Sequence, residues 1–416
     1  MATLGVIADD LTGATDIAIA LTSAGHRTAV VLGEGVPLGG AAADADALVV
    51  ALKSRTAPVG EAVAASLEAL DRLRAAGCER FYVKYCSTFD STPEGNIGPV
   101  CEAVLEALGE EATVIAPAFP ANGRTVYRGH LFVGDDLLEE SPMRHHPLTP
   151  MTDSSLVRLL EPQVSRGGDD IALVPWPVVS RGVDAVRAAL ARAAAGGARF
   201  AVVDALSDDD LDVLARAASG LRLLTGGSAL ARWLPGPHPV GHLPLTPPEG
   251  PRVVLSGSAS RATQGQVRHA LAAGSGHRLA PGDLRTDFDG TVARAAEAAL
   301  GAPADAPFVV YATAAPEHVV DAADAPLIEE ALAETAVRLV AAGVRALLVA
   351  GGETSGAVVG RLGVGPLAVG PEVDPGVAWM LARTGGSGDG DDLRLMLKSG
   401  NFGREDLFVR AWEEGA

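Results

Sequence analysis

The stretch from residue 82 to 92 is Tyr82-Val83-Lys84-Tyr85-Cys86-Ser87-Thr88-Phe89-Asp90-Ser91-Thr92. An apolar run that begins at Arg80-Phe81 predicts a strand, which ends in hydroxyl groups, one lysine and one aspartate. A helix is expected to begin directly afterwards, at Pro93-Glu94. In open α/β sheets, ligands bind at the carboxyl ends of strands. Hydroxyl groups with one cation and one carboxylate at such an end are suited to binding a small polyhydroxy acid.

Strands and helices alternate on both sides of this stretch. We expect strands at residues 4–8, 28–32, 47–52, 80–86 and 113–117, and helices at residues 60–76 and 93–108. This alternation is typical of a mostly parallel, doubly wound sheet. The sequence therefore predicts an α/β fold in which helices flank a mostly parallel sheet.

Polar residues follow several of these strands. Asp9 and Asp10 follow the first, and Lys53 and Arg55 follow the third. Because the carboxyl ends of parallel strands meet at one edge of a sheet, we expect these residues to line one site. The candidate substrate-binding residues are Asp9, Asp10, Lys53, Arg55, Lys84, Ser87, Thr88, Asp90 and Ser91. Three more polar residues follow the strand at 113–117, namely Asn122, Arg124 and Thr125. The alternative for Asp10 or Thr12 is an ordinary helix N-cap.

Lysine is rare in this chain. Only Lys53, Lys84 and Lys398 occur, against thirty arginines among the 33 basic residues. An ammonium is a compact point charge that a guanidinium does not replace at every site, so each lysine is a candidate for contact with an anion. The alternative is chance retention at a partly buried position.

A proline-rich segment separates the chain into two parts. Residues 236–251 predict a linker between one domain at 1–235 and another at 252–416. Two domains are also the natural expectation for 416 residues. In each we expect a mostly parallel sheet flanked by helices.

Loops rich in glycine and serine follow predicted strands in the second domain. They begin at residues 256, 351 and 398, and their small residues let backbone N–H groups approach a phosphate. The candidate nucleotide-binding residues are Ser256, Ser258, Gly351, Gly352, Glu353, Thr354, Ser355, Lys398 and Gly400. Neither a Walker A sequence nor a G-x-G-x-x-G fingerprint occurs, which counts against a P-loop or a dinucleotide site.

The composition restricts the partners. A net charge of −19 argues against nucleic acid and anionic membranes. We expect neither a transmembrane helix nor a secretory signal, because no long uncharged apolar run occurs. Cys78, Cys86 and Cys101 lack metal-ligand spacing and are expected to be reduced thiols of a cytoplasmic protein. His145-His146 has no third ligand at diagnostic spacing, so the metal ligands stay unassigned.

Motifs along the whole chain resemble the four-carbon acid sugar kinase family. They lie at residues 7–16, 84–99, 120–127, 143–147, 151–154, 351–356 and 397–403. Within the family, Cys86-Ser87-Thr88 is most similar to the kinases of 3-oxo-tetronates, while Leu11 stands where the family pattern has phenylalanine. The resemblance implies an N-terminal domain that binds the acid sugar, a C-terminal domain that binds ATP, and an active site in the cleft between them.

The resemblance also implies a reaction. That reaction is ATP-dependent phosphorylation of the 4-hydroxyl of a 3-oxo-tetronate, 3-dehydro-erythronate or 3-dehydro-threonate, in sugar-acid catabolism. The acid-sugar contacts carried over are Asp9 or Asp10, Arg55, Lys84 and the turn from Ser87 to Ser91, and the ATP contacts are Ser256 or Ser258, Gly352 to Ser355 and Gly400. Mg²⁺ is implied by the ATP chemistry.

We expect direct phosphoryl transfer, in which positioning and charge stabilisation provide most of the catalysis. Arg55 is the preferred partner of the substrate carboxylate, because a guanidinium binds a carboxylate bidentately. Lys84 or Lys398 would neutralise the charge on the transferred group, and Asp10 or Asp90 would accept the hydroxyl proton. The catalytic candidates are therefore Asp10, Lys84 and Asp90.

Three alternatives stay open at this point. The first is a kinase of the same family that acts on D-threonate, D-erythronate or 3-oxo-isoapionate. The second is a nicotinamide-dependent dehydrogenase, which the missing fingerprint disfavours. The third is a non-catalytic two-domain solute-binding protein. The expected partners are a small acid sugar and ATP, and a homo-oligomer stays open.

Overall fold

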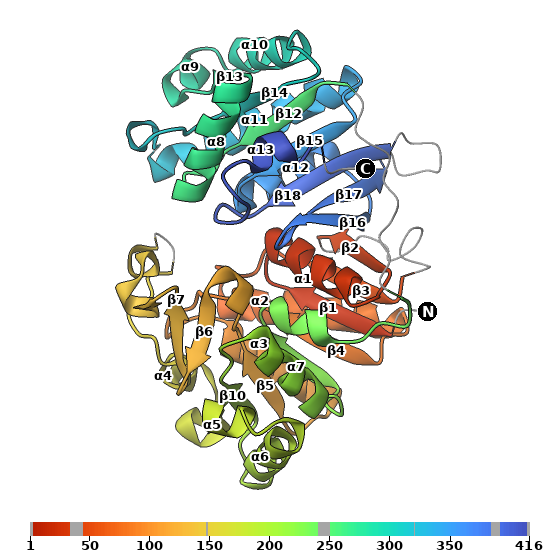
Figure 1. The fold of residues 1–416 in the computed structure, drawn as a ribbon, viewed down its shortest axis with the longest axis vertical. Helices are drawn as coiled ribbons and strands as arrows, with labels where there is room; N and C mark the ends of the chain where they lie inside the picture. The colour runs from red at the N-terminus through yellow and green to blue at the C-terminus, as the bar shows by residue number, and fades with distance from the viewer. Residues whose placement is uncertain are drawn as a thin grey trace. The chain divides into compact units, whose positions relative to one another are not determined.

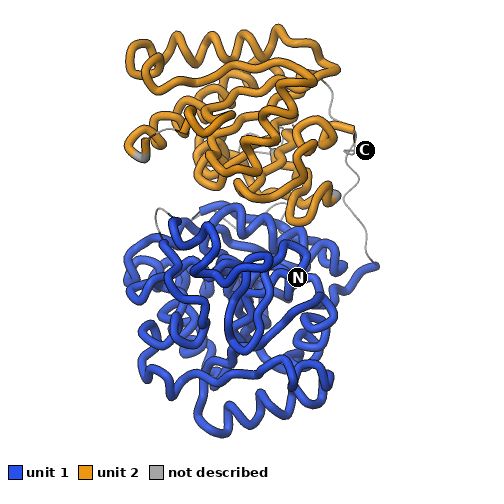
Figure 2. The backbone as a smooth tube through the Cα atoms, turned by 60° about the vertical axis from the view of Figure 1, so that its left-hand side comes forward, with its two compact units in different colours: residues 1–241 blue, residues 242–416 orange. Residues whose placement is uncertain are grey.

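The computed structural model describes residues 3–33, 45–146, 149–239, 250–319, 321–383 and 392–413. The chain separates into two compact units, Met1–Gly241 and His242–Ala416, which Figure 2 colours separately. Most of the predicted linker at 236–251 lies outside the described residues. None of the described helices is long and apolar enough to cross a membrane.

The first unit is built on a parallel sheet, and Figure 1 labels most of its strands. The strand order is β2-β3-β1-β4-β11-β5-β10-β9. Every neighbouring pair in this order is parallel. The strands are β1 (Leu4–Ala8), β2 (Thr28–Leu32), β3 (Ala47–Ala51), β4 (Arg80–Lys84), β5 (Thr113–Ala116), β9 (Ile171–Val174), β10 (Phe200–Val203) and β11 (Leu223–Gly226). The helices are α1 (Leu11–Ser23), α2 (Val59–Ala75), α3 (Ile97–Leu108), α4 (Leu156–Leu160), α5 (Trp176–Val179), α6 (Val183–Ala195) and α7 (Asp208–Ala217). The predicted α/β fold is confirmed in this unit.

The start of helix α3 differs from the prediction. The helix expected at Pro93 begins at Ile97, because the buried side chain of Asn96 turns back to the preceding loop. Its amide donates to the carbonyl oxygens of Ser54 at 2.7 Å and Ala57 at 3.1 Å.

A small antiparallel sheet follows β5 along the chain. It consists of β6 (Arg124–Tyr127), β7 (His130–Val133) and β8 (Asp136–Leu137). Arg128 and Gly129 form a two-residue turn with φ of 54° and 75°, and both backbone N–H groups donate to the carboxylate of Asp204. A carboxylate distant in the sequence therefore stabilises this turn, and local sequence does not reveal such a partner.

The second unit has the strand order β13-β14-β12-β15-β18-β17-β16. The sheet is parallel from β13 to β18 and antiparallel at β18-β17 and β17-β16. The strands are β12 (Arg252–Ser256), β13 (Ser275–Arg278), β14 (Pro307–Tyr311), β15 (Ala346–Ala350), β16 (Leu367–Asp374), β17 (Val377–Arg383) and β18 (Asp392–Lys398). The helices are α8 (Arg261–Ala273), α9 (Pro281–Thr286), α10 (Phe288–Leu300), α11 (Ala325–Ala341), α12 (Gly352–Leu362) and α13 (Leu407–Arg410).

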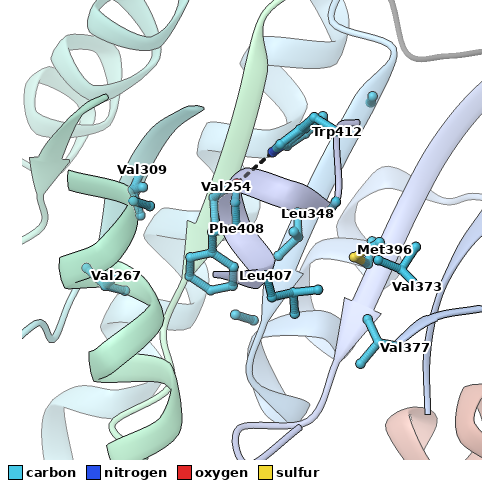
Figure 3. Close-up of a cluster of buried hydrophobic side chains, with 14 of the residues drawn as sticks. Val254, Val267, Val309, Leu348, Val373, Val377, Met396, Leu407, Phe408 and Trp412 are labelled. Atoms are coloured by element: carbon cyan, nitrogen blue, oxygen red, sulfur yellow. Dashed lines mark hydrogen bonds between the residues drawn. The ribbon is translucent and has the colours of Figure 1, made fainter. Parts of the chain in front are cut away.

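The core of the second unit is closed by the C-terminal segment (Figure 3). Phe408 and Trp412 pack with Leu348 and Val254 from the central strands. The indole of Trp412 donates to the Phe408 carbonyl at 2.8 Å, so its one polar atom is satisfied inside the apolar cluster.

Replacing Leu348 should therefore leave a cavity. Leu348→Ala should lower the free energy of unfolding by about 2–5 kcal/mol. Leu300→Ala is the matched control, because Leu300 is 39% exposed and should lose less than about 1 kcal/mol. The measurement is chemical denaturation followed by tryptophan fluorescence. Equal losses in both variants would contradict this account of the core.

Candidate active site

The carboxyl ends of five neighbouring strands meet at one edge of the first unit, because β3, β1, β4, β11 and β5 are adjacent and parallel. Arg55 follows β3, Asp9 and Asp10 follow β1, and Lys84 ends β4. The structure brings these four predicted residues together. Lys53 follows β3 as well, but its side chain is exposed.

Arg55 is held by both aspartates. Its Nε and Nη2 donate to the two carboxylate oxygens of Asp9 at 2.8 Å each, and Nη2 also donates to Asp10 at 2.7 Å. All three side chains are mostly shielded from solvent. The bidentate edge of Arg55 is therefore used inside the protein, and this differs from its expected use on a substrate carboxylate.

Lys84 is buried, with only 3% of its surface exposed. Its Nζ donates to the carbonyl of Tyr85 at 2.9 Å. An ammonium has two further N–H donors, and neither has a partner among the described residues. A buried cation with open donors is the arrangement expected where an anion or a hydroxyl group of a ligand binds.

Gly13 makes room for this lysine, and sequence reasoning missed it. Gly13 lies in the first turn of α1, where its backbone N–H donates to the N-cap Asp10 at 2.8 Å. A Cβ at this position would lie 2.3 Å from Asp10 Oδ1 and 2.9 Å from Lys84 Nζ. Only glycine leaves the aspartate and the ammonium in place.

The two aspartates differ in their proton affinity. Burial raises the pKa of Asp9, despite the opposing effect of Arg55. Burial acts on Asp10 in the same direction, but Arg55, Lys84 and hydrogen bonds from Thr12 and Gly13 outweigh it and lower the pKa of Asp10. Asp10 is therefore an ionised carboxylate whose oxygen atoms are already hydrogen-bonded.

The turn that follows β4 is conformationally restricted. Phe89 is fully buried with φ of 51°, a conformation that is rare for an aromatic residue, and its ring packs edge-on against Tyr85 at 5.5 Å. Thr88 donates to Oδ1 of the buried Asp90 at 2.6 Å, while Oδ2 has no partner in the described part of the chain. The turn thus presents one free carboxylate oxygen at the sheet edge.

Ser87 and Ser91 are the remaining predicted residues of this turn. Ser87 is half-buried and lies close to Gly227, just past β11. A Cβ added to Gly227 would lie 3.7 Å from the Cβ of Ser87. The Ser91 hydroxyl accepts from the side chain of Gln163 at 2.9 Å. This hydrogen bond links the turn to Gln163, in the segment that follows α4.

Cys86 lies near Arg55 and Lys84 as well as near Asp90. Its thiol forms a hydrogen bond with the Thr88 hydroxyl at 2.9 Å. Burial raises the pKa of this thiol to about 12; Asp90 adds to the increase, while Arg55 and Lys84 oppose it.

Loops after neighbouring strands also meet in the second unit. Ser256 ends β12, Gly351 follows β15 and Lys398 ends β18, and these strands are adjacent. The N–H groups of residues 257 and 258 donate to the Ala350 carbonyl, and that of Gly351 donates to the Lys398 carbonyl. The three predicted nucleotide loops therefore form one surface.

Helix α12 begins without a side-chain cap. Gly351, with φ of 126°, precedes it, and the first helical residues Gly352 and Glu353 are exposed. Thr354 and Ser355 are buried, and the buried hydroxyls of Ser256 and Ser355 have no hydrogen-bond partner in the described residues. An open helix N-terminus beside unpaired hydroxyls is suited to a phosphate group.

Lys398 has a different position from the one expected. It is fully buried, and its ammonium donates to the Thr263 hydroxyl, the Gln266 side chain and the Gly400 carbonyl at 2.9, 2.8 and 3.2 Å. All three donors are thus used within the unit. Lys398 holds the Gly400 loop, where Ser260 and Thr263 also donate to the Gly400 carbonyl.

Comparison with known proteins agrees with this division. The family model of a sugar-binding N-terminal domain matches residues 4–234, and that of a nucleotide-binding C-terminal domain matches residues 253–408. A 3-oxo-tetronate kinase of Burkholderia multivorans is 48% identical over 98% of this chain and 96% of its own. The chain belongs to the four-carbon acid sugar kinase family.

Other relatives lead to the same family. A 3-oxo-tetronate kinase of Cupriavidus necator is also 48% identical, over 98% of this chain and 96% of its own. The crystal structure of a Haemophilus influenzae protein superposes with a TM-score of 0.78 at 40% identity, covering 99% of this chain and 100% of that one. The family resemblance and the two-domain α/β fold are confirmed.

A side chain at position 13 should disturb the first site. Gly13→Ala should lower the kcat/KM of the kinase reaction at least about tenfold, because displacement of a positioning group by about 1 Å is costly. Gly60→Ala, in helix α2, is the matched control, because a Cβ there meets nothing within 4 Å. Steady-state kinetics and melting temperatures of both variants check this. Equal activity in the two would contradict the crowding at Gly13.

Lys398 should make stability depend on pH. Burial lowers its pKa from the ordinary 10.5 to about 7. Between these values the unfolded chain holds more protons, so the free energy of unfolding should rise with pH, by at most about 1.4 kcal/mol per pH unit. Lys398→Met should remove this contribution, while Lys53→Met, at an exposed position, should keep it. Denaturation at pH 7, 8 and 9 is the measurement, and identical slopes in both variants would contradict the assignment.

Proposed function

We propose that this protein is an ATP-dependent kinase that phosphorylates the 4-hydroxyl of a 3-oxo-tetronate. The observation that carries the proposal is the 48% identity to 3-oxo-tetronate kinases over 98% of the chain. The cluster of Lys84, Arg55 and the two aspartates at one sheet edge supports it, because a polyhydroxy acid needs both cations and hydrogen-bond acceptors.

The proposed step is a direct displacement. The oxygen of the 4-hydroxyl forms a bond to the γ-phosphorus of ATP, and the bond from that phosphorus to the β,γ-bridging oxygen breaks. The hydroxyl proton passes to a carboxylate, and the products are a phosphate monoester and ADP. Such a reaction depends on positioning and charge stabilisation.

Asp90 is the proposed proton acceptor. Both oxygens of Asp10 accept hydrogen bonds, from Gly13 and Arg55 on one and Thr12 on the other. Asp90 keeps one oxygen without a partner in the described structure. A base must be within hydrogen-bond reach of the proton it removes, which favours the carboxylate with the open oxygen.

Lys84 is the proposed cation of the acceptor site. Its two open donors support contact with an oxygen of the substrate or of the transferred phosphoryl group. The carboxylates of Asp9 and Asp10 balance the positive charges of Lys84 and Arg55. Ser87 and Thr88 remain proposed contacts to substrate hydroxyls, and Lys53 a contact at the exposed rim.

The second unit is proposed to bind the nucleotide. The N-terminus of α12 would hold a phosphate through backbone N–H groups, with Ser256, Ser258 and Gly400 on the adjoining loops. Mg²⁺ would accompany ATP and neutralise phosphate charge. No group of three or more potential ligand side chains forms among the described residues, and the His146 imidazole is engaged with Thr149. This fits a Mg²⁺ held mainly by phosphates and water.

The test is ATP consumption with a panel of four-carbon acids, with and without the 3-oxo group. Turnover should be restricted to 3-oxo-tetronates. Lys84→Met and Asp90→Asn should each reduce kcat/KM at least about 100-fold, since each removes a group proposed to act in the transition state. Exposed residues provide matched controls, Arg216→Met and Asp184→Asn, which should retain activity.

The outcomes separate the alternatives. Turnover of D-threonate, D-erythronate or 3-oxo-isoapionate instead would keep the kinase and overturn the substrate. ATP binding without turnover of any acid would overturn the proposed acceptor site. Full activity of Asp90→Asn would assign the proton to another group.

A further inference from the structure

A second arginine, Arg124, lies at the same sheet edge, and one edge of its guanidinium has no hydrogen-bond partner among the described residues. Arg124 begins β6, directly after the short 3₁₀ helix at Pro120–Asn122 that follows β5. Its Nη1 donates to the carbonyl of Asn122. Its Nε is buried without a partner, and Nη2 has none among the described residues. The amide nitrogen of Asn122 is likewise buried and unpaired.

These donors belong to the first site. Strand β5 lies beside β11, which lies beside β4, so the segment that follows β5 shares its edge with the turn at residues 86–91. Arg124 interacts electrostatically with Cys86, Asp90 and Asp16. The two carboxylates are hydrogen-bonded elsewhere, Asp16 to Ser228 and Asp90 to Thr88. No ion pair within the described chain uses the Nε–Nη2 edge of Arg124.

Arg55 and Arg124 differ in whether the Nε–Nη2 edge is available to a substrate carboxylate. The corresponding edge of Arg55 is filled by Asp9. Burying a donor without a partner is unfavourable, so the unpaired Nε of Arg124 indicates a missing acceptor. An Nε–Nη2 edge presents two parallel N–H groups, which match the two oxygens of a carboxylate.

We infer that Arg124 binds the carboxylate of the acid sugar through Nε and Nη2, with the Asn122 amide as an additional donor. This inference rests on the proposed function, and it replaces Arg55 as the expected carboxylate partner. It assigns the acid end of the substrate to the segment after β5, and the reacting end to Lys84 and Asp90 after β4. Selection of an acid over a neutral sugar then depends on Arg124.

The test compares an acid with its neutral amide. The acid turned over in the panel and its carboxamide are assayed with wild type, Arg124→Gln and Arg124→Lys. Arg124→Gln should raise the KM for the acid about 30-fold or more, since two charge-assisted hydrogen bonds are lost, and should leave the KM for ATP unchanged. The preference for acid over amide should fall by the same factor. Arg124→Lys should recover only part, because an ammonium has no fork.

Arg128→Gln is the matched control, because Arg128 is exposed on the same hairpin. Melting temperatures show whether each variant folds, and Arg124→Lys keeps the test valid if Arg124→Gln does not. Equal losses with acid and amide, or a KM for the acid that does not change, would overturn the inference.

Calorimetric titration of D-erythronate separates this inference from the proposed function. Binding of D-erythronate to the wild type but not to Arg124→Gln would support the carboxylate site, and the kinase proposal alone would be overturned if, in addition, no acid of the panel is phosphorylated. Binding that is equal in both proteins would overturn the carboxylate site. Absence of binding of every acid of the panel to the wild type would overturn both.

Discussion

The first unit depends on one largely shielded group of charges, the guanidinium of Arg55 between Asp9 and Asp10. Buried charges are tolerated only when they are paired, so the loops after β1 and β3 must lie where these side chains meet. Backbone bonds support the same arrangement, because the N–H groups of Ser54 and Arg55 donate to the Asp9 carbonyl. The Asp10 side chain also caps α1, so the helix, two loops and Lys84 are fixed together.

Removing one charge of such a group leaves the others without a partner. The resulting loss of folding free energy is larger than the net stabilisation that the intact group provides. This explains why a binding site can keep two aspartates that need not touch the ligand. They allow a lysine and an arginine to stay charged in a shielded place, and their geometry leaves the open donors of Lys84 unoccupied. The turn at residues 86–91 adds a second fixed part through the buried ring of Phe89.

Much of this organisation could be predicted from the sequence. The parallel strands alternate regularly with helices, and the polar residues after β1, β3 and β4 share one sheet edge, as predicted. The prediction could not decide which arginine uses its fork internally, because Arg55 and Asp9 lie 46 positions apart. Lys398 was assigned to a ligand because lysine is rare, whereas its three acceptors come from residues 263, 266 and 400. Helix α3 starts late for a similar reason, since the partners of Asn96 belong to another loop.

The cysteines give the site a further property. Burial raises the pKa of Cys78 to about 11, and those of Cys86 and Cys101 to about 12. Oxidants and alkylating reagents attack the thiolate, a form that the raised pKa of Cys86 disfavours at neutral pH. The cysteine between Lys84 and Asp90 is thus a hydrogen-bonding group rather than a nucleophile. Peroxide that inactivates enzymes with exposed thiolates should spare this one.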